Sequence, residues 1–321
     1  MLYLNRAEME SVFSMREAFD AVGQAFSIYT AGGAQVPLRI GLEVAARDAQ
    51  LLFMPAMAGE AIGTKVVGFF PQNTAKGLPV TPGTMLVFDV ETGVLSCIMD
   101  GTYLTQVRTA AAAGLATELL ATPDARSAAL IGLGGQAPCQ LLALLEAAPT
   151  LEEVRVFDLD PARKSAFATE RADWPCRIVP AETADQAVEG AQLVTVVTTA
   201  RAPVFSYASL GKGVHVNGIG SYQHEMQELP EELVVGCDLL VFDTVEGVLS
   251  ESGDILKPLA KGLLAGKNLD IEIGHVIAGQ VRRKSADEVT LYKGVGSGVL
   301  DIVTAAAIYK KALAAGIGTK F

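Results

Sequence analysis

A glycine-rich turn between two short apolar runs holds the residues that point most directly to a chemistry. Residues 127–131 form an apolar run, and Gly132, Gly134 and Ala137 follow it at the spacing Gly-x-Gly-x-x-Ala. Gly132 allows a tight turn, Gly134 lets a pyrophosphate approach the backbone, and Ala137 lets the next helix pack closely on a sheet. The first amides of that helix would face the phosphates with the positive end of the helix dipole. The spacing therefore predicts a strand–turn–helix unit that binds a dinucleotide.

An acidic residue ends the next β-rich run, residues 154–158, and predicts which dinucleotide binds. The Asp158 carboxylate can accept hydrogen bonds from both ribose hydroxyls, but it would repel a 2′-phosphate. Leu159 and Asp160 offer no cation for such a phosphate, and Arg163 is the nearest basic residue. We therefore expect the cofactor to be NAD (NADH) rather than NADP.

Three cations upstream of this unit suggest a second binding function. Arg39, Lys65 and Arg108 lie among small or apolar residues, and Arg108 is followed by a run of alanines. A buried cation is costly without an anion, and little near Arg108 in the sequence could neutralise it. A carboxylate clamp would use the bidentate geometry of Arg and the point charge of Lys65, which could also donate a proton. Internal salt bridges or solvated surface charges are the alternative interpretation.

Composition narrows the classes of partner. The chain has 321 residues, is 50% hydrophobic and carries a net charge of −11. This length and hydrophobicity allow two cores, and the negative charge argues against nucleic acid and anionic membranes as partners. No apolar stretch is long enough to span a membrane, and the N-terminus does not resemble a signal peptide. We expect no membrane association.

The cysteine and histidine residues indicate neither disulfides nor a metal site. The four cysteines are scattered, with no Cys-x-x-Cys pair, as is typical of a protein of the reducing cytoplasm. His215, His224 and His275 have no metal-ligand spacing. A cytoplasmic protein without a metal is expected, and His215 is interpreted as a packed or hydrogen-bonded strand residue.

The N-terminal third differs in texture from the rest of the chain. Ser14 and Glu17 form a capping box, which predicts the start of a helix. Residues 36–99 are short β-rich runs broken by Pro and Gly, which predict a mostly antiparallel sheet. An Ala-rich helix is expected over 102–121, ended by Pro123.

The rest of the chain alternates strands with helices, a pattern that predicts a doubly wound parallel sheet. Strands are expected near 127–131, 153–158, 177–179, 192–199, 214–217 and 238–242. A last helix, about 299–315, is expected to return to the first domain. The fold class is then α/β, with a Rossmann NAD-binding domain (121–293) inserted in a discontinuous α+β substrate and dimerisation domain (1–120 plus 294–321).

Short segments along the whole chain resemble those of one known family. They are Met54 with Pro55 and residues 63–67, 71–73, 77–79, 89–93, 99–100, 105–111, 132–137, 220–222 and 228–229. On these segments the chain resembles the ornithine cyclodeaminase/μ-crystallin family. The resemblance implies a homodimer and hydride transfer between NAD(P) and the Cα of an amino or imino acid.

The resemblance also implies roles for individual residues. It places Arg39, Lys65 and Arg108 at the substrate carboxylate, with Ser221 and Val295 as further substrate contacts and with Lys65 and Arg108 as catalytic residues. The cofactor contacts that motif and resemblance together imply are Thr84, Arg108, Thr109, Gly132, Gly134, Gly135, Gln136, Ala137, Asp158, Thr199, Gly218, Ile219, Gly220, Ser221 and Gly294.

Two departures from the family pattern bear on the substrate. Cyclodeaminase members carry an acidic residue shortly before the Met-Pro pair, where this chain has Leu52. They also carry an Asp in the loop after the fifth Rossmann strand, where this chain has Ser221 and Tyr222. An ammonium side chain needs a carboxylate partner and a base to deprotonate it, so both departures argue against a diamino acid substrate.

Three functions therefore stand in order of preference. The first is NADH-dependent reduction of an α-imino acid, preformed or made from a 2-oxo acid and ammonia, to an L-amino acid. An amino-acid dehydrogenase of the alanine dehydrogenase type belongs to this class. The second is an NAD-dependent cyclodeaminase of a diamino acid. The third is a non-catalytic μ-crystallin-like protein that binds a small molecule.

Overall fold

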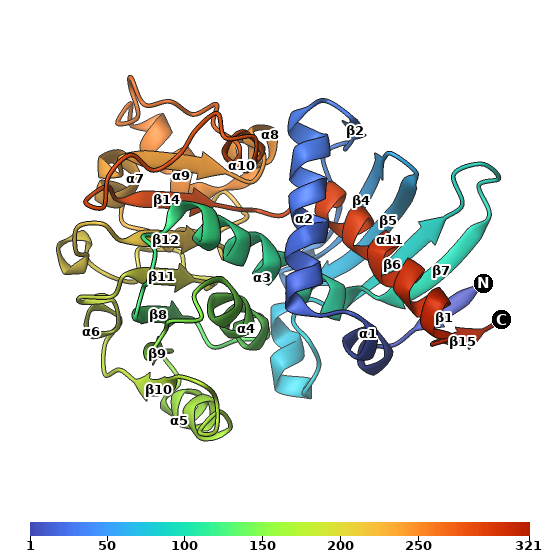
Figure 1. The fold of residues 1–321 in the computed structure, drawn as a ribbon, viewed down its shortest axis with the longest axis horizontal. Helices are drawn as coiled ribbons and strands as arrows, with labels where there is room; N and C mark the ends of the chain where they lie inside the picture. The colour runs from blue at the N-terminus through green and yellow to red at the C-terminus, as the bar shows by residue number, and fades with distance from the viewer. The chain divides into compact units, whose positions relative to one another are not determined.

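The computed structural model describes all 321 residues, and they divide into two compact units (Figure 1). Unit 1 comprises Met1–Ala111 and Ser297–Phe321, and unit 2 comprises Ala112–Gly296. The first boundary falls inside one continuous helix, α3 (Gly101–Leu120), whereas the sequence places its domain limit at the end of that helix. The domain limits at 120/121 and 293/294 stay predictions.

Unit 1 is built on one sheet whose strand order is β15-β1-β7-β6-β5-β4-β2, with β3 also paired to β4. Neighbouring strands are antiparallel, as expected, except that β1 runs parallel to β7. The strands are β1 (Leu2–Leu4), β2 (Ala34–Gln35), β3 (Ile40–Val44), β4 (Ala49–Ala58), β5 (Ala61–Phe69), β6 (Gly83–Phe88), β7 (Leu95–Asp100) and β15 (Thr319–Lys320).

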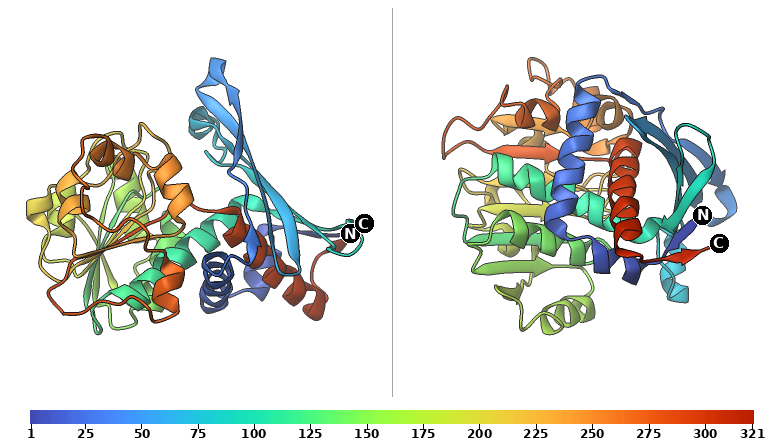
Figure 2. Two further views of the ribbon diagram at one scale, coloured as in Figure 1. Left: turned by 90° about the horizontal axis from the view of Figure 1, so that it is seen from above. Right: turned by 45° about the vertical axis from the view of Figure 1, so that its right-hand side comes forward.

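Two helices from opposite ends of the chain cover one face of this sheet. In Figures 1 and 2, α2 (Met15–Thr30) and α11 (Gly298–Ala315) lie side by side, and α11 packs on β4, β5 and β6. The predicted capping box at the start of α2 is confirmed, because Ser14 and Glu17 hydrogen-bond each other's backbone amides. Short helices α1 (Arg6–Val12), η1 (Ala45–Arg47) and η2 (Pro71–Lys76) complete the unit. The prediction that the last helix returns to the N-terminal fold is confirmed.

Unit 2 is a doubly wound domain with a seven-stranded sheet of order β10-β9-β8-β11-β12-β14-β13, in which every pair is parallel. Its strands are β8 (Ser127–Ile131), β9 (Glu153–Phe157), β10 (Arg177–Pro180), β11 (Leu193–Val196), β12 (His215–Gly218), β13 (Leu239–Phe242) and β14 (Thr290–Lys293). Its helices are α4 (Ala137–Ala147), α5 (Pro161–Thr169), α6 (Ala184–Val188), η3 (Tyr207–Ser209), α7 (Glu231–Gly236), α8 (Val245–Glu251), α9 (Gly253–Ala260) and α10 (Ile273–Ile277).

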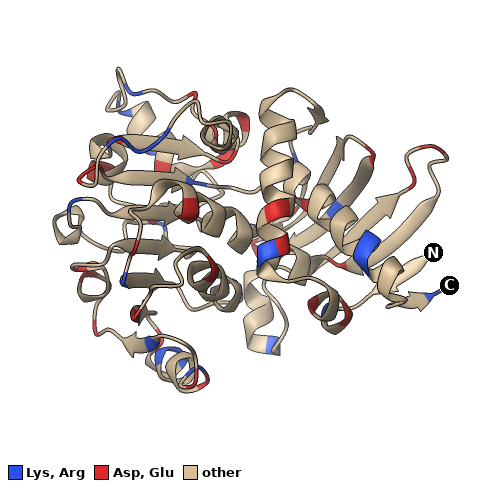
Figure 3. Ribbon diagram, viewed as in Figure 1, with Lys and Arg blue, Asp and Glu red and all other residues tan.

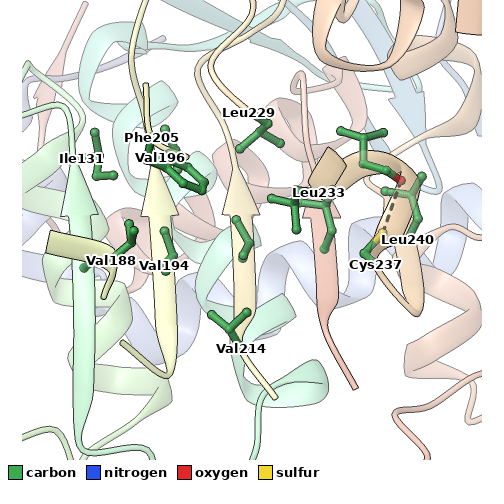
Figure 4. Close-up of a cluster of buried hydrophobic side chains, with 14 of the residues drawn as sticks. Ile131, Val188, Val194, Val196, Phe205, Val214, Leu229, Leu233, Cys237 and Leu240 are labelled. Atoms are coloured by element: carbon green, nitrogen blue, oxygen red, sulfur yellow. Dashed lines mark hydrogen bonds between the residues drawn. The ribbon is translucent and has the colours of Figure 1, made fainter. Parts of the chain in front are cut away.

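The core of unit 2 explains why the sequences of strands β8, β11 and β13 are almost continuously apolar. Val194, Val196 and Val214 are fully buried among branched side chains from neighbouring strands and from the helices packed on them (Figure 4). Strands that are covered on both faces are apolar along their whole length, so period-two alternation is absent. The fold class predicted from this pattern is confirmed.

Two details of the sheet differ from the sequence expectation. Strand β11 ends at Val196 instead of reaching 199, because the backbone N–H of Thr198 turns to the Glu228 carboxylate. Strand β14 was not predicted, since it has only two apolar residues and ends in a charged one, Lys293. No helix has the length and apolar character needed to cross a lipid bilayer.

Candidate active site

Lys65 is a buried cation in an apolar sheet. It lies on β5 with only 1% of its surface exposed, and its cross-strand neighbours are Met54 on β4 and Met85 on β6. Figure 3 shows that charged residues lie mainly on helices and loops, so a lysine on a central strand is an exception. Burial of this kind requires an anion nearby.

That anion is Asp301, which the sequence analysis did not identify. Its carboxylate is fully buried on α11, and its Oδ1 accepts hydrogen bonds from Lys65 Nζ at 2.8 Å and from Arg108 Nε at 2.9 Å. Lys65 Nζ also lies 2.7 Å from Asp301 Oδ2. The anion that neutralises Arg108 comes from a helix nearly two hundred residues away in sequence, so the residues near Arg108 in the sequence could not reveal it.

The three side chains leave an excess of positive charge. Two cations share one carboxylate, and Asp301 is the only acceptor that the structure gives to Lys65 or Arg108. Arg108 uses Nε for this bond, so the two terminal nitrogens of its fork are not engaged by Asp301. One carboxylate balances the charge of one cation. An internal salt bridge therefore accounts for one of the two cations and leaves the second unexplained.

The charge environment also tunes Lys65. Burial lowers the pKa of its ammonium from 10.5 to about 7, the negative charge of Asp301 opposes that shift, and the positive charges of Arg108 and Arg39 add to it. Arg39, half-buried between β2 and β3, therefore lies within electrostatic reach of Lys65. A lysine with such a pKa can hold an anion when charged and can exchange a proton near neutral pH.

The glycine-rich turn of unit 2 has the geometry that its sequence predicts. Gly132 has φ +91°, and a Cβ there would lie 2.6 Å from the carbonyl oxygen of Val197. Gly134 is exposed, and a Cβ added to it meets nothing within 4 Å. Ala137 is fully buried at the first position of α4. The turn therefore presents open backbone at a helix start, which fits a pyrophosphate.

Gln136 adds to this turn a buried polar atom that has no hydrogen-bond partner. It precedes α4 directly, and its Oε1 is buried without a hydrogen-bond partner in the structure. A buried acceptor without a partner is uncommon in proteins, and this one could accept a hydrogen bond from a ligand hydroxyl such as that of a ribose. The residues present at the turn thus fit a bound dinucleotide.

Asp158 is already engaged by protein groups. Its Oδ2 accepts a hydrogen bond from the Leu133 amide at 2.8 Å, and its Oδ1 accepts one from the Asp160 amide at 2.9 Å. Arg163 Nη1 lies 3.2 Å from Oδ2. Arg163, noted in the sequence only as the nearest basic residue, is carried back onto the end of β9 by the first turn of α5.

The other residues of unit 2 that are predicted to contact the cofactor gather at the carboxyl ends of β11, β12 and β14. Thr199 is exposed after β11, Gly218 ends β12, and Ile219, Gly220 and Ser221 follow it. Gly294 and Val295 follow β14, and the Val295 amide donates to Asp243 Oδ2 at 2.9 Å. Ligands of open parallel sheets bind at this edge.

Besides Arg108, two predicted cofactor residues lie in unit 1. Thr109 is half-buried on α3, next in sequence to Arg108. Thr84 is exposed on β6, and because side chains alternate along a strand it points to the face opposite Met85, the cross-strand neighbour of Lys65. The structure therefore does not bring Thr84 into the Lys65 cluster.

Other polar groups have structural partners. His215 is buried, with Nδ1 2.8 Å from Thr290 Oγ1 and Nε2 3.1 Å from Asn217 Oδ1, in agreement with its interpretation as a hydrogen-bonded strand residue. No group of three or more His, Cys, Asp or Glu side chains is arranged to hold a metal ion. His224 reaches the Ser250 carbonyl at 2.7 Å.

The residue that sequence reasoning missed had a usable signal. Asp301 is the only acidic residue in α11, whose other buried positions are Gly, Thr and apolar residues. The rule that drew attention to Lys65 and Arg108, a charge in an apolar stretch, applies equally to Asp301. The same rule could have identified a second group of charged residues that are fully buried in unit 2: Glu228, Asp254 and Lys293.

Comparisons with known proteins extend these observations. Residues 1–316 match the model of the ornithine cyclodeaminase/mu-crystallin family. Delta(1)-pyrroline-2-carboxylate reductase of Bacillus thuringiensis subsp. konkukian is 33% identical over 100% of this chain and 99% of its own.

Two solved structures are similar over nearly their whole length. The Thermococcus litoralis Delta(1)-pyrroline-2-carboxylate reductase in complex with NADH and L-proline is 38% identical, with a TM-score of 0.95 and 100% of both chains covered. An archaeal alanine dehydrogenase dimer with bound NAD is 32% identical, with a TM-score of 0.92 and coverage of 100% of this chain and 98% of its own. The family predicted from the sequence is confirmed.

Proposed function

The chain belongs to the ornithine cyclodeaminase/mu-crystallin family, and on that premise we propose that it reduces an α-imino acid to an L-amino acid with NADH. The observation that carries the proposal is the Lys65–Asp301–Arg108 cluster, a buried group with one more cation than carboxylate. The charge of such a group is balanced only when a further anion binds, and the carboxylate of an imino acid supplies that anion. Reduction of a C=N bond is also the activity for which the pyrroline-2-carboxylate reductases are named.

Each residue of the cluster has a role in this proposal. Arg108 offers the free fork of its guanidinium to the substrate carboxylate, and Lys65 adds a point charge and a proton near neutral pH. Arg39 contributes a further positive charge, and Ser221 and Val295 are further substrate contacts. Asp301 positions both cations. A carboxylate held by cations makes the adjacent imine carbon more electrophilic.

The cofactor site of the proposal uses the residues of the glycine-rich turn and the neighbouring loops. Gly132, Gly134, Gly135, Gln136 and Ala137 would hold the pyrophosphate, and Asp158 the adenosine ribose. Arg108, Thr109, Thr199, Gly294 and residues 218–221 would contact the nicotinamide half, with Thr84 as a more distant candidate. When bound, NADH supplies the hydride for the imine carbon.

We propose a cyclic imine as the first substrate to test. The two similar pyrroline-2-carboxylate reductases support it, and so do the apolar neighbours of Lys65, Met54 and Met85. Leu52 is buried on the same strand as Met54 and provides no carboxylate for an ammonium side chain. Alanine dehydrogenase activity, with pyruvate and ammonia, is the second candidate because an archaeal enzyme of that name is similar over the whole chain.

Two other functions have weaker support. A cyclodeaminase would need a base for the diamino acid, and Leu52 and Ser221 stand where the family pattern has acidic residues. A non-catalytic binding protein would leave the buried Lys65–Asp301–Arg108 cluster and the glycine-rich turn in need of a separate explanation.

We further propose a cytoplasmic homodimer. Leu38, Ile40 and Leu42, which we call the β3 stripe, are 47%, 59% and 55% exposed on or beside an outer strand of the unit 1 sheet. An apolar stripe on an outer strand requires a cover, and a second copy of the chain supplies an equal stripe. The archaeal relative is a dimer. The scattered cysteines support a reducing compartment.

The test of the function is an NADH-oxidation screen. Delta(1)-pyrroline-2-carboxylate should oxidise NADH in equimolar amounts, faster than pyruvate, glyoxylate or oxaloacetate with ammonia. Ornithine and lysine serve as the comparison, because a cyclodeaminase would release ammonia without net change in NADH. If no imino substrate oxidises NADH although the protein binds NADH, the proposed reduction is contradicted and the non-catalytic binding protein is favoured.

A further inference from the structure

A second buried charge cluster lies in unit 2, and the proposed function uses none of its residues. Glu228, Lys293 and Asp254 are each fully buried. Lys293 Nζ lies 3.2 Å from Asp254 Oδ2 and 3.9 Å from Glu228 Oε1. Two carboxylates and one ammonium leave an excess negative charge, so this cluster needs hydrogen-bond donors rather than an anion.

Those donors are the loops at the carboxyl ends of β11 and β12. Glu228 Oε2 accepts from the Thr198 amide at 2.7 Å and from its hydroxyl at 3.0 Å. Glu228 Oε1 accepts from the amides of Gly220 and Ser221, the latter at 3.3 Å. One side chain therefore joins two loops that leave different strands, one through each carboxylate oxygen.

The other two members of the cluster fix this carboxylate. Asp254 Oδ1 accepts from the backbone amides of Glu228 and Leu229 at 2.8 and 3.0 Å. Lys293, the last residue of β14, donates to the Gly218 carbonyl at 3.1 Å. The cluster thus ties the ends of β12 and β14 to the segment that carries Glu228.

Close packing transmits this arrangement to the pyrophosphate turn. A Cβ on Gly220 would lie 1.9 Å from the Thr198 carbonyl and 2.5 Å from Glu228 Oε2, so the two loops touch without room for a side chain. A Cβ on Gly132 would lie 2.9 Å from Thr198 Cγ2. Movement of Thr198 would therefore disturb both the Gly220 loop and the Gly132 turn.

From these contacts we infer that Glu228 is a positioning residue, whose carboxylate holds residues 198–199 and 220–221 in the conformation that receives the dinucleotide. This inference rests on the proposed cofactor site. Glu228 touches neither cofactor nor substrate in it, and it acts through the backbone of the two loops. Burial raises the pKa of Glu228 to about 7 against the opposing charge of Lys293, so the ionised form depends on the loop donors.

Only a carboxylate of this length can serve both loops. A carboxamide has one acceptor oxygen, so Glu228→Gln would place an NH₂ group against the donors of one loop. The same variant leaves Lys293 and Asp254 as a balanced pair, so the domain should still fold. Glu228→Asp keeps the charge but is one methylene shorter, and it cannot reach both loops.

The first test is amide hydrogen exchange on the cofactor-free protein, about one pH unit above the pKa of Glu228. In Glu228→Gln and Glu228→Asp, peptides covering 197–200 and 219–222 should exchange roughly tenfold faster than in the wild type, with β8 unchanged. Glu232→Gln, the same substitution at an exposed position of α7, is the control and should match the wild type. Wild-type exchange at both loops in both variants, or equal acceleration throughout unit 2, would overturn the inference.

The second test is the dissociation constant for NADH, measured by fluorescence beside the melting temperature. Both Glu228 variants should bind NADH about tenfold more weakly or worse, while the melting temperature of Glu228→Asp stays near that of the wild type. NADH binding that matches the wild type in both variants would contradict the positioning role. If the wild type itself does not bind NADH, the proposed function fails, whereas hydrogen exchange still decides whether Glu228 holds the loops.

Discussion

Replacement of Lys65 by Met separates the two roles that a buried cation can have. Lys65 and Arg108 share Asp301, so Lys65→Met leaves the Arg108–Asp301 pair with its 2.9 Å hydrogen bond. That remaining pair is neutral, and Met is similar to the lysine stem in length. We therefore expect unit 1 to stay folded and to lose only the excess positive charge.

The magnitude follows from the interaction that is lost. A charge-assisted hydrogen bond from a buried ammonium to a substrate carboxylate contributes about 3 kcal/mol, which corresponds to roughly two orders of magnitude in kcat/KM. Lys65 is 1% exposed, so solvent would not screen this contact. NADH affinity should change little, because the pyrophosphate turn belongs to unit 2 and Lys65 to unit 1.

Asp301→Asn should behave in the opposite way. It leaves two buried cations without an anion, and removal of one partner from a buried ion pair typically costs about 3–5 kcal/mol of stability. The melting temperature should then fall clearly, unlike that of Lys65→Met. Lys310→Met, on the exposed side of α11, is the matched control for Lys65→Met and should leave both activity and stability unchanged.

The assay is steady-state NADH oxidation with Delta(1)-pyrroline-2-carboxylate, beside NADH binding and thermal unfolding of each variant. A stable Lys65→Met protein that binds NADH and keeps full activity would refute the substrate role of the cluster. Parallel loss of activity, NADH binding and melting temperature would show instead that Lys65 only supports the fold.

Four further predictions concern the same groups. Because the pKa of Lys65 is lowered to about 7 and its charged form is needed, wild-type kcat/KM should fall as pH rises above that value, and Lys65→Met should lack this decrease. Arg108→Lys should lower kcat/KM by about tenfold or more, since an ammonium cannot bind Asp301 and a bidentate substrate carboxylate at once. A fully active Arg108→Lys variant would show that bidentate binding by the guanidinium is not needed. The wild type should have a higher kcat/KM with NADH than with NADPH. Asp158→Ala should narrow or reverse this preference, because Arg163, which lies 3.2 Å from Asp158 in the wild type, becomes available to a 2′-phosphate. The double variant Asp158→Ala with Arg163→Ala should not gain NADPH activity. Light scattering at micromolar concentration should report a dimer, and Ile40→Glu in the β3 stripe should shift it toward monomer; a wild-type monomer would contradict the assembly.

Local sequence patterns were sufficient for most of the fold. The turn at Gly132, the capping box at Ser14 and the apolar strands of unit 2 each depend on neighbours within a few residues, and the structure places them as expected. Strand β14 was missed because two apolar residues between a threonine and a lysine give too weak a pattern. The Asp158–Arg163 contact escaped because it follows from the entry angle of α5, which spacing alone does not give.

Long-range charge pairing was the part that the sequence did not reveal. Lys65, Arg108 and Asp301 come from a strand and two helices, and the first and the last are 236 positions apart in sequence. Each could be recognised as a charge in an apolar stretch, but the pairing depends on how α11 crosses the sheet. The same holds for Lys293 with Asp254, so a single sequence indicates which charges are buried and not which charges meet.

The two buried clusters differ in what balances their excess charge, and this difference assigns them different roles. The excess carboxylate in unit 2 is surrounded by donors, since Glu228 and Asp254 together accept from the amides of Thr198, Gly220, Ser221, Glu228 and Leu229. Its charge is therefore satisfied by the protein, as a positioning group requires. The excess cation in unit 1 has no comparable set of acceptors, because Asp301 alone accepts from Lys65 and Arg108. A buried positive charge that the protein leaves unbalanced is retained at a cost in stability, and a bound carboxylate removes that cost. For this reason we propose the cation cluster as the place where substrate binds.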